Sequence, residues 1–255
     1  MNWKPGIAMM LAAVLCWPAY GAEIKVLGSV VVQGILRDGI IPEFERETGN
    51  KVVAEFAGNA IVRQRIEQGE TFDLVILGPP SAIDDLAKSG VIAANARAPF
   101  GRASLGMSVR SGAPKPDIST VAAFKTTLQS VKSVAMTDPK TAGIPAVYLL
   151  KLAGEKLGMR DEFQSKLYPT KAGEVGSAVA EGRAEIGIEG IPEIVTENGV
   201  ALVGPLPDEV QLRADFAIGV SARSKEPEAA RQLLKFLSSP KGIEAIKARG
   251  MEPGL

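Results

Sequence analysis

Two short motifs, Gly28-Ser29 and Gly58-Asn59, place small and hydrogen-bonding residues where a strand pattern gives way to a helix pattern. The first follows a strand pattern at 23–27, and the second follows a β-type run that begins at Val52. Free N–H groups at the start of a helix favour a bound anion. In open α/β sheets, ligands bind beyond the carboxyl ends of the strands. Because a right-handed parallel βαβ unit brings successive junctions to one edge of the sheet, the motifs predict an anion site there.

Charged residues near such junctions have alternative roles. Asn59 stands where an N-cap is expected, and capping alone is the alternative to ligand binding. Arg63 could hold a carboxylate in a bidentate manner, or form an exposed pair with Glu67 at i, i+4. Glu189 follows an apolar strand and could exchange protons with a ligand, or it could point to solvent or form a salt bridge between two halves of the molecule.

The candidate ligand-binding residues therefore lie at the junctions and in one loop of the second half of the chain. They are Gly28, Ser29, Val30, Gly58, Asn59, Ala60, Arg63, Gly78, Thr141, Gly143, Ile144, Pro145, Glu189 and Gly190. Glu189 is also the candidate catalytic residue if the protein is an enzyme.

Strand and helix patterns alternate along the chain, which predicts an α/β protein with mainly parallel sheets. Pro42 is expected to kink the helix pattern that begins at Val32, because proline removes a backbone hydrogen bond. The predicted strands are 23–27, 52–56, 72–77, 102–110, 134–137, 184–188, 200–203 and 212–220, and the predicted helices after the first include 175–180, 226–238 and 240–250.

The strand-to-helix junctions fall in two groups, one before residue 105 and one after residue 134. This grouping predicts two lobes, the first made of 23–105 and 216–255 and the second of 106–215. The strands at 102–110 and 212–220 would cross between them.

The amino-acid composition excludes several kinds of partner and catalytic site. The chain has 255 residues, with 29 Lys plus Arg and 29 Asp plus Glu, so no basic surplus indicates a nucleic-acid partner. It has no His, and its one Cys, Cys16, lies in a predicted signal peptide. Disulfides, thiol nucleophiles, His-based triads and His/Cys zinc sites are thus excluded from the mature protein. No cofactor and no metal site are predicted.

Residues 1–22 have the pattern of a secretory signal peptide: Lys4, an apolar run from Ile7 to Leu15, and small residues ending at Ala22. The apolar run is short for a bilayer-spanning helix. The sequence therefore predicts a periplasmic protein cleaved after Ala22.

These segments resemble a known family. EIKVLGSVVV, PEFERETG, FAGNAIVRQRIEQGETFDLVI, TDPKTAGIPAVY, AEIGI and KFLSSPKGIEAIKARG are similar, in this order, to periplasmic solute-binding proteins of ABC importers, in the branch of the molybdate-binding proteins. The resemblance implies a two-lobed periplasmic binding protein fold, with two mainly parallel sheets joined by two crossing strands and a small anion held between the lobes. It also implies an ABC permease in the inner membrane as partner.

The same resemblance indicates a ligand other than molybdate. The branch holds its oxyanion with two serines and a tyrosine, and the corresponding places here are Val31, Asn59 and Gly190, although a two-residue slip would restore Ser29. A carboxylate-bearing small molecule is the favoured alternative ligand.

Two function classes follow. The first is a monomeric binding protein that delivers a small anion to a permease by closure of two lobes. The second is a cofactor-free isomerase of a small tricarboxylate, because the branch also contains periplasmic aconitate isomerase and an allylic proton shift needs only an acid/base group and anion clamps. No feature supports a structural or adhesive role.

Overall fold

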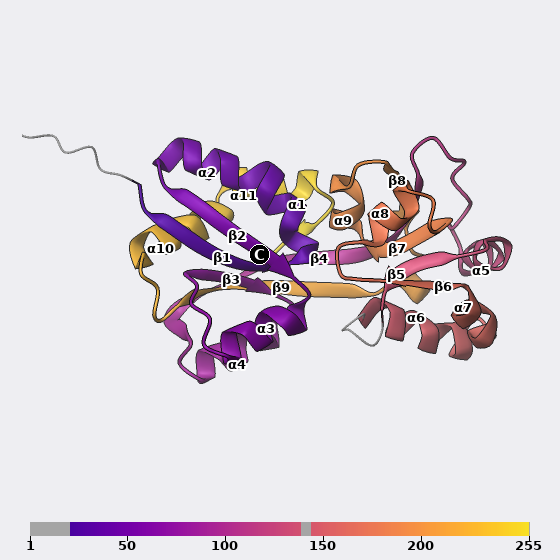
Figure 1. Ribbon diagram of the computed structural model, residues 1–255, viewed down its shortest axis with the longest axis horizontal. Helices are drawn as coiled ribbons and strands as arrows, with labels where there is room; N and C mark the ends of the chain where they lie inside the picture. The colour runs from indigo at the N-terminus through magenta and orange to yellow at the C-terminus, as the bar shows by residue number, and fades with distance from the viewer. Residues whose placement is uncertain (1–20, 139–143, 255) are drawn as a thin grey trace, which may run out of the picture.

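The computed structural model describes residues 21–138 and 144–254, and these form two lobes connected by long strands (Figure 1). The predicted signal peptide lies almost wholly outside the described residues, as do Thr141 and Gly143. Each lobe is an α/β layer structure with helices on both faces of its sheet, as the alternating sequence pattern predicts.

The first lobe has a sheet in the order β2-β1-β3-β9-β4, with β10 added to β4. Strand β1 is parallel to β2 and β3, whereas β9 is antiparallel to β3 and β4. Its strands are β1 (Glu23–Ser29), β2 (Lys51–Ala57), β3 (Leu74–Leu77), β4 (Ile92–Arg110), β9 (Arg213–Ser221) and β10 (Glu252–Pro253). Its helical elements are η1 (Val30–Val32), α1 (Gln33–Ile35), η2 (Leu36–Ile40), α2 (Ile41–Thr48), α3 (Asn59–Glu67), α4 (Pro80–Lys88), α10 (Pro227–Leu237) and α11 (Pro240–Ala248).

The second lobe continues the sheet from the other half of β4, in the order β4-β7-β5-β6, with β8 also paired to β4. Strand β5 is parallel to β6 and β7. Its strands are β5 (Val134–Thr137), β6 (Leu167–Thr170), β7 (Ile186–Gly190) and β8 (Val200–Pro205). Its helical elements are α5 (Val121–Ser130), α6 (Ile144–Glu155), α7 (Arg160–Lys166), α8 (Val175–Ala180), α9 (Ile191–Thr196) and η4 (Asp208–Val210).

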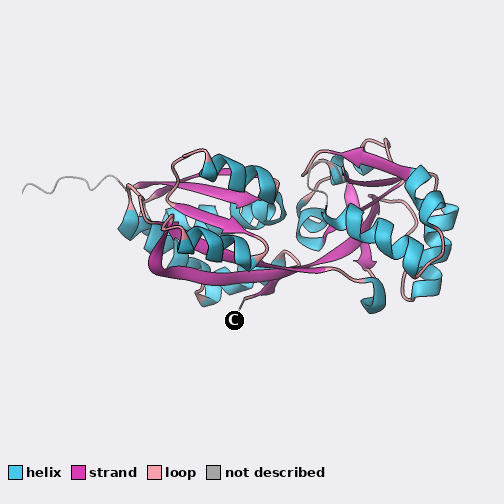
Figure 2. Cartoon of the chain, turned by 90° about the horizontal axis from the view of Figure 1, so that it is seen from below, coloured by secondary structure: helices cyan, strands magenta, loops and turns pink. Residues whose placement is uncertain are grey.

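Two segments cross between the lobes, as predicted. Strand β4 passes from the first lobe into the second, and the segment after β8 returns to enter β9 (Figure 2). Gln211 ties the two crossings together: its side chain accepts from the Leu105 N–H at 2.8 Å and donates to the Leu105 carbonyl at 3.0 Å. The predicted crossing strands are thus confirmed, while the lobe boundaries at 105/106 and 215/216 stay a prediction.

The first helix differs in detail from its prediction. The chain passes from η1 through α1 into a π-helical turn, η2, before α2 begins. Pro42 lies in the first turn of α2, directly after the π-helical turn, so the hydrogen bond that it cannot donate falls where the helix changes from π to α geometry. The interruption expected at Pro42 is therefore located just before it, in the π-helical turn.

Each lobe buries apolar side chains from the strand and helix faces that the sequence pattern identified. Ile24, Val26, Phe44 and Leu233 belong to one core of the first lobe, and a second core lies on the opposite face of the sheet. Phe124 and Phe163 are fully buried in the second lobe. Because each lobe has its own core, the lobes can move relative to each other without unpacking either one.

Candidate ligand-binding site between the lobes

A cavity of about 380 Å³ lies between the lobes, and we call it the interlobe cleft. The first lobe supplies the ends of β1, β2 and β3, and the second lobe supplies the ends of β5 and β7. The lining residues are Ser29, Val30, Val31, Gly58, Asn59, Gly78, Pro79, Pro80, Ala103, Ser104, Leu105, Thr137, Pro145, Ala172, Gly190, Glu193, Leu212, Arg213, Ala214, Asp215 and Phe216. The predicted junctions therefore converge on one cavity.

On the first-lobe wall, two side chains organise the junctions. Ser29 is the last residue of β1, and its hydroxyl accepts from the Val31 N–H at 3.4 Å. The Asn59 amide oxygen accepts from the Gly78 N–H at 3.2 Å, which links the start of α3 to the end of β3. Gly58, not Asn59, is the N-cap of α3, so the predicted capping role of Asn59 is wrong. Since its oxygen is engaged with Gly78, Asn59 has amide hydrogens left to offer a ligand.

On the second-lobe wall, Glu193 is an ionisable side chain that lines the cleft, and Arg213 and Asp215 line it further along, at the crossing segments. It is the third residue of α9, and its carboxylate accepts from the Gly190 N–H at 3.3 Å. Burial raises the pKa of Glu193 to about 7, and the hydrogen bond from Gly190 opposes that shift. Glu193 therefore changes charge near neutral pH.

Glu189 does not line the cleft. It is 6% exposed and lines a different cavity, of about 260 Å³, which we call the second cavity. Its Oε1 has no hydrogen-bond partner among the described residues. Burial, and then the neighbouring carboxylates of Glu193 and Glu197, raise the pKa of Glu189 well above its ordinary value, which favours its neutral form.

The structure divides the other predicted site residues into two groups. Ser29, Val30, Gly58, Asn59, Gly78, Pro145 and Gly190 line the cleft, whereas Gly28, Ala60 and Arg63 do not. Arg63 pairs instead with Glu67 at 2.8 Å and with Asp85 at 3.5 Å on the surface of the first lobe, which was the alternative role for this residue. Ile144 begins α6 beside Pro145.

Glu193 was missed by the sequence reasoning, although a signal for it exists. Gly190-Ile191-Pro192 followed by Glu193 is a helix start, because proline favours the first turn and a Glu at the third position can reach back to the N-terminal N–H. The pattern is hard to detect because α9 has only six residues, too few for a clear helical periodicity.

The charges along the cleft are largely neutralised. Arg213 pairs with Asp208 at 2.5 Å, and Asp215 pairs with Arg102 at 2.7 Å. Among the described lining residues, Arg213 is the single cation. An anion in the cleft would therefore be held mainly by N–H, amide and hydroxyl donors.

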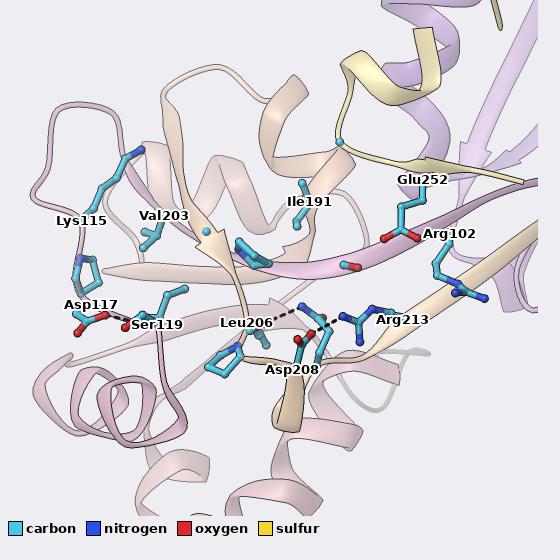
Figure 3. A pocket seen from close by; sticks show the side chains of 18 residues that line it. Arg102, Lys115, Asp117, Ser119, Ile191, Val203, Leu206, Asp208, Arg213 and Glu252 are labelled. Carbon is cyan, nitrogen blue, oxygen red and sulfur yellow. Dashed lines mark hydrogen bonds and ion pairs between the residues drawn. The ribbon is translucent and has the colours of Figure 1, made fainter. Parts of the chain in front are cut away.

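A larger and more open cavity, of about 670 Å³, lies along the crossing segments and is lined by residues of both lobes (Figure 3). The charged side chains labelled in Figure 3 include Arg213 and Asp208, which form an ion pair. They also include Arg102 and Glu252, which lie on adjacent strands. None of the predicted junctions Ser29, Asn59 or Gly190 lines it. The interlobe cleft, where the junctions meet, is the better candidate for a ligand site.

A family model described as bacterial extracellular solute-binding protein matches residues 24–252, and the chain belongs to this family. Within it, the relatives place the chain in the branch of the molybdate-binding proteins. It is 27% identical to the molybdate-binding protein ModA of Azotobacter vinelandii, over 94% of this chain and 93% of that one. It is 34% identical to an aconitate isomerase of a Pseudomonas species, over 98% of this chain and 96% of that one.

Solved structures show the same fold. The periplasmic molybdate-binding protein of Azotobacter vinelandii superposes with a TM-score of 0.76 at 18% identity, covering 91% of this chain and all of that one. The sulfate-binding protein SubI of Mycobacterium tuberculosis superposes with a TM-score of 0.71 at 20% identity, covering 91% and 87%. The two-lobed fold predicted from the sequence is thereby confirmed. In the part of the chain that the structure describes, no helix combines the length and apolarity needed to cross a bilayer.

Proposed function

We propose that this protein captures a small carboxylate-bearing anion in the interlobe cleft, in the periplasm, and presents it to an ABC permease. The observation that carries the proposal is the convergence of Ser29, Asn59 and Gly190 on one cavity that belongs to both lobes. Its volume of about 380 Å³ falls within the roughly 300–1,000 Å³ of small-molecule sites. Family membership supports the binding role.

The choice of a carboxylate over molybdate rests on the donors. Val31 and Gly190, which stand where the molybdate-binding branch has hydroxyl donors, both line the cleft and offer no polar side-chain group. An oxyanion oxygen left without a donor in a closed cleft would cost about 1–3 kcal/mol. Asn59, Ser104 and Thr137 are spread around the cleft, which suits an elongated anion with several carboxylates better than a compact tetrahedral one.

The test is a thermal-shift screen, followed by calorimetry, of molybdate, sulfate, citrate, cis-aconitate and trans-aconitate. A ligand that binds only the folded state raises Tm in proportion to RT ln(1 + [L]/Kd). We expect at least one tricarboxylate to raise Tm and molybdate to have little effect. Sub-micromolar molybdate affinity would overturn the carboxylate assignment.

The second candidate is an isomerase of a small tricarboxylate, favoured by the relative named aconitate isomerase at 34% identity over nearly the whole chain. An allylic proton shift needs a base that takes a proton from one carbon while the double bond moves, and an acid that returns a proton to the other terminal carbon. The sequence suggested Glu189 for this role. Glu193 is the better proposal, because it lines the cleft and has a pKa of about 7.

Proton NMR of cis- and trans-aconitate incubated with the purified protein separates the two functions. Interconversion that is lost in Glu193→Gln and retained in Glu189→Gln would establish the isomerase and its base. Stoichiometric binding without turnover would leave the transport role.

A further inference from the structure

Glu193 lies between two cavities. Its side chain lines the interlobe cleft and also lines the second cavity, which contains Glu189 and Glu197 from the second lobe and Arg37 and Asp38 from the first. Among the described residues, Val30 and Glu193 are the two that line both cavities, and Val30 carries no ionisable group. Glu193 is therefore the ionisable side chain shared by the ligand cavity and its polar neighbour.

The groups around Glu193 do not neutralise its charge. On the second-lobe side, Glu189 on β7 and Glu197, which directly follows α9, are further acids. Both have pKa values raised chiefly by burial. On the first-lobe side, Arg37 and Asp38 face the second cavity with opposite charges. In the cleft, Arg213 is paired with Asp208 and Asp215 with Arg102. Among the described residues, Glu193 forms no ion pair, and its carboxylate accepts a hydrogen bond from the Gly190 N–H.

A bound anion would face the Glu193 carboxylate across the cleft. Two like charges in a partly buried site repel strongly, and the repulsion favours protonation of the group with the higher pKa. Protonated Glu193 would turn from a repelling acceptor into an O–H donor for a ligand oxygen. The proton would come from solvent, and the second cavity provides a polar region next to Glu193 that is distinct from the ligand cavity.

We infer that Glu193 couples ligand binding to proton uptake, so that an anion enters the cleft together with one proton that is held on the Glu193 carboxyl. This inference rests on the proposed function, since it requires that the cleft takes an anion. It holds for a transported solute and for a converted substrate. The pKa of Glu193, at about 7, supports it because the unliganded carboxyl is ionised above that pH and free to accept the proton.

The experiment measures proton uptake by calorimetry of trans-aconitate binding in two buffers of different ionisation enthalpy. At about pH 8 we expect the wild type to take up roughly one proton per ligand, and at about pH 6 far less, with affinity falling up to about tenfold per pH unit above 7. Glu193→Gln should abolish the uptake and flatten the pH dependence, because its amide donates without titrating.

Glu197→Gln is the matched control. It makes the same change one helical turn further on, at a residue that lines the second cavity alone. Proton uptake should remain near one in this variant. Uptake that persists in Glu193→Gln, or that disappears equally in both variants, would overturn the inference.

A ligand-free measurement separates this inference from the proposed function. Carbon-13 NMR of Glu-labelled protein should show one carboxyl titrating near neutral pH that is absent from Glu193→Gln. A Glu193 carboxyl that titrates near about 4.5, the ordinary value of a glutamate, would overturn the inference whichever ligand binds. A screen in which no anion binds would overturn the proposed function instead. Circular dichroism and Tm establish that each variant is folded.

Discussion

Gly34 in α1 contacts Thr196 in α9 across the two lobes, and the lack of a side chain at Gly34 permits this contact. A Cβ added at Gly34 would lie 2.5 Å from Thr196 Cγ2 and closer still to its Cβ and Oγ1. Thr196 cannot rotate away fully, because its Cβ is fixed to the α9 backbone. Gly34→Ala would therefore force α1 and α9 apart by about 1 Å to restore ordinary contact near 3.4 Å.

The expected loss of ligand affinity follows from the energetic cost of overpacking at Gly34. Inserting a methyl group into a tight contact costs about 1–3 kcal/mol, and here that cost applies only to the arrangement in which the lobes touch. If ligand binds that arrangement, its affinity should fall about 5- to 150-fold. Stability should not fall in parallel, because each lobe keeps its own core and alanine favours a helix over glycine by about 1 kcal/mol.

The assay combines calorimetric affinity for a ligand identified in the screen with small-angle X-ray scattering of the ligand-free protein. We expect weaker binding, a slightly larger radius of gyration and an unchanged or raised Tm. Thr196→Gly in the same chain should restore affinity, because it removes the opposing Cβ. Gly154→Ala is the control: it makes the same change in α6, where the new Cβ would meet Arg160 at an ordinary 3.4 Å. Wild-type affinity in Gly34→Ala would refute the view that this contact belongs to the ligand-binding state.

Three further substitutions test local interactions. Asp73→Ala should lower the free energy of unfolding by about 3 kcal/mol in urea titrations, because the buried Asp73 carboxylate accepts from the Lys25 N–H at 2.8 Å and from residues 224–226 before α10. Glu70→Gln should cost about 1–2 kcal/mol at neutral pH, after allowance for solvent screening. Arg65, and then Lys25, lower the pKa of Glu70 to about 2. This stabilisation is therefore present above about pH 4.5 and lost as the pH falls through about 2. Equal stability of Glu70→Gln and wild type at pH 7 would contradict this prediction. Asn59→Asp keeps an acceptor for the Gly78 N–H, so Tm should change little while affinity for an anion drops at least tenfold by calorimetry; full-strength binding would place the ligand elsewhere.

The sequence correctly predicted those helices and strands that have a clear apolar periodicity within their own residues. Strand 134–137 and helix 175–180 appear with the predicted bounds, because apolar residues at the right period mark a buried strand and a buried helix face. Strand β6 was missed, since Pro169 within a short run argues against a strand. Pro169 is tolerated because β6 is the last strand of the sheet order and pairs with β5 on one side.

The sequence also determined the general position of the site. Gly28-Ser29 and Gly58-Asn59 marked strand-to-helix junctions, and parallel strands necessarily bring such junctions to one edge of the sheet. The absence of His and of a mature Cys limited the available acid/base groups to carboxylates, lysines and tyrosines. Neither conclusion required knowledge of how the two lobes meet.

Only the tertiary structure decided which carboxylate belongs to the cleft. Successive side chains of a strand point to opposite faces, so once Gly190 lies in the cleft, Glu189 must point away from it. Glu193 reaches the cleft because α9 turns back at Gly190 and places its third residue over the end of β7. Its shifted pKa depends on burial between the lobes, which is set by residues distant in the chain, and no local pattern encodes that burial.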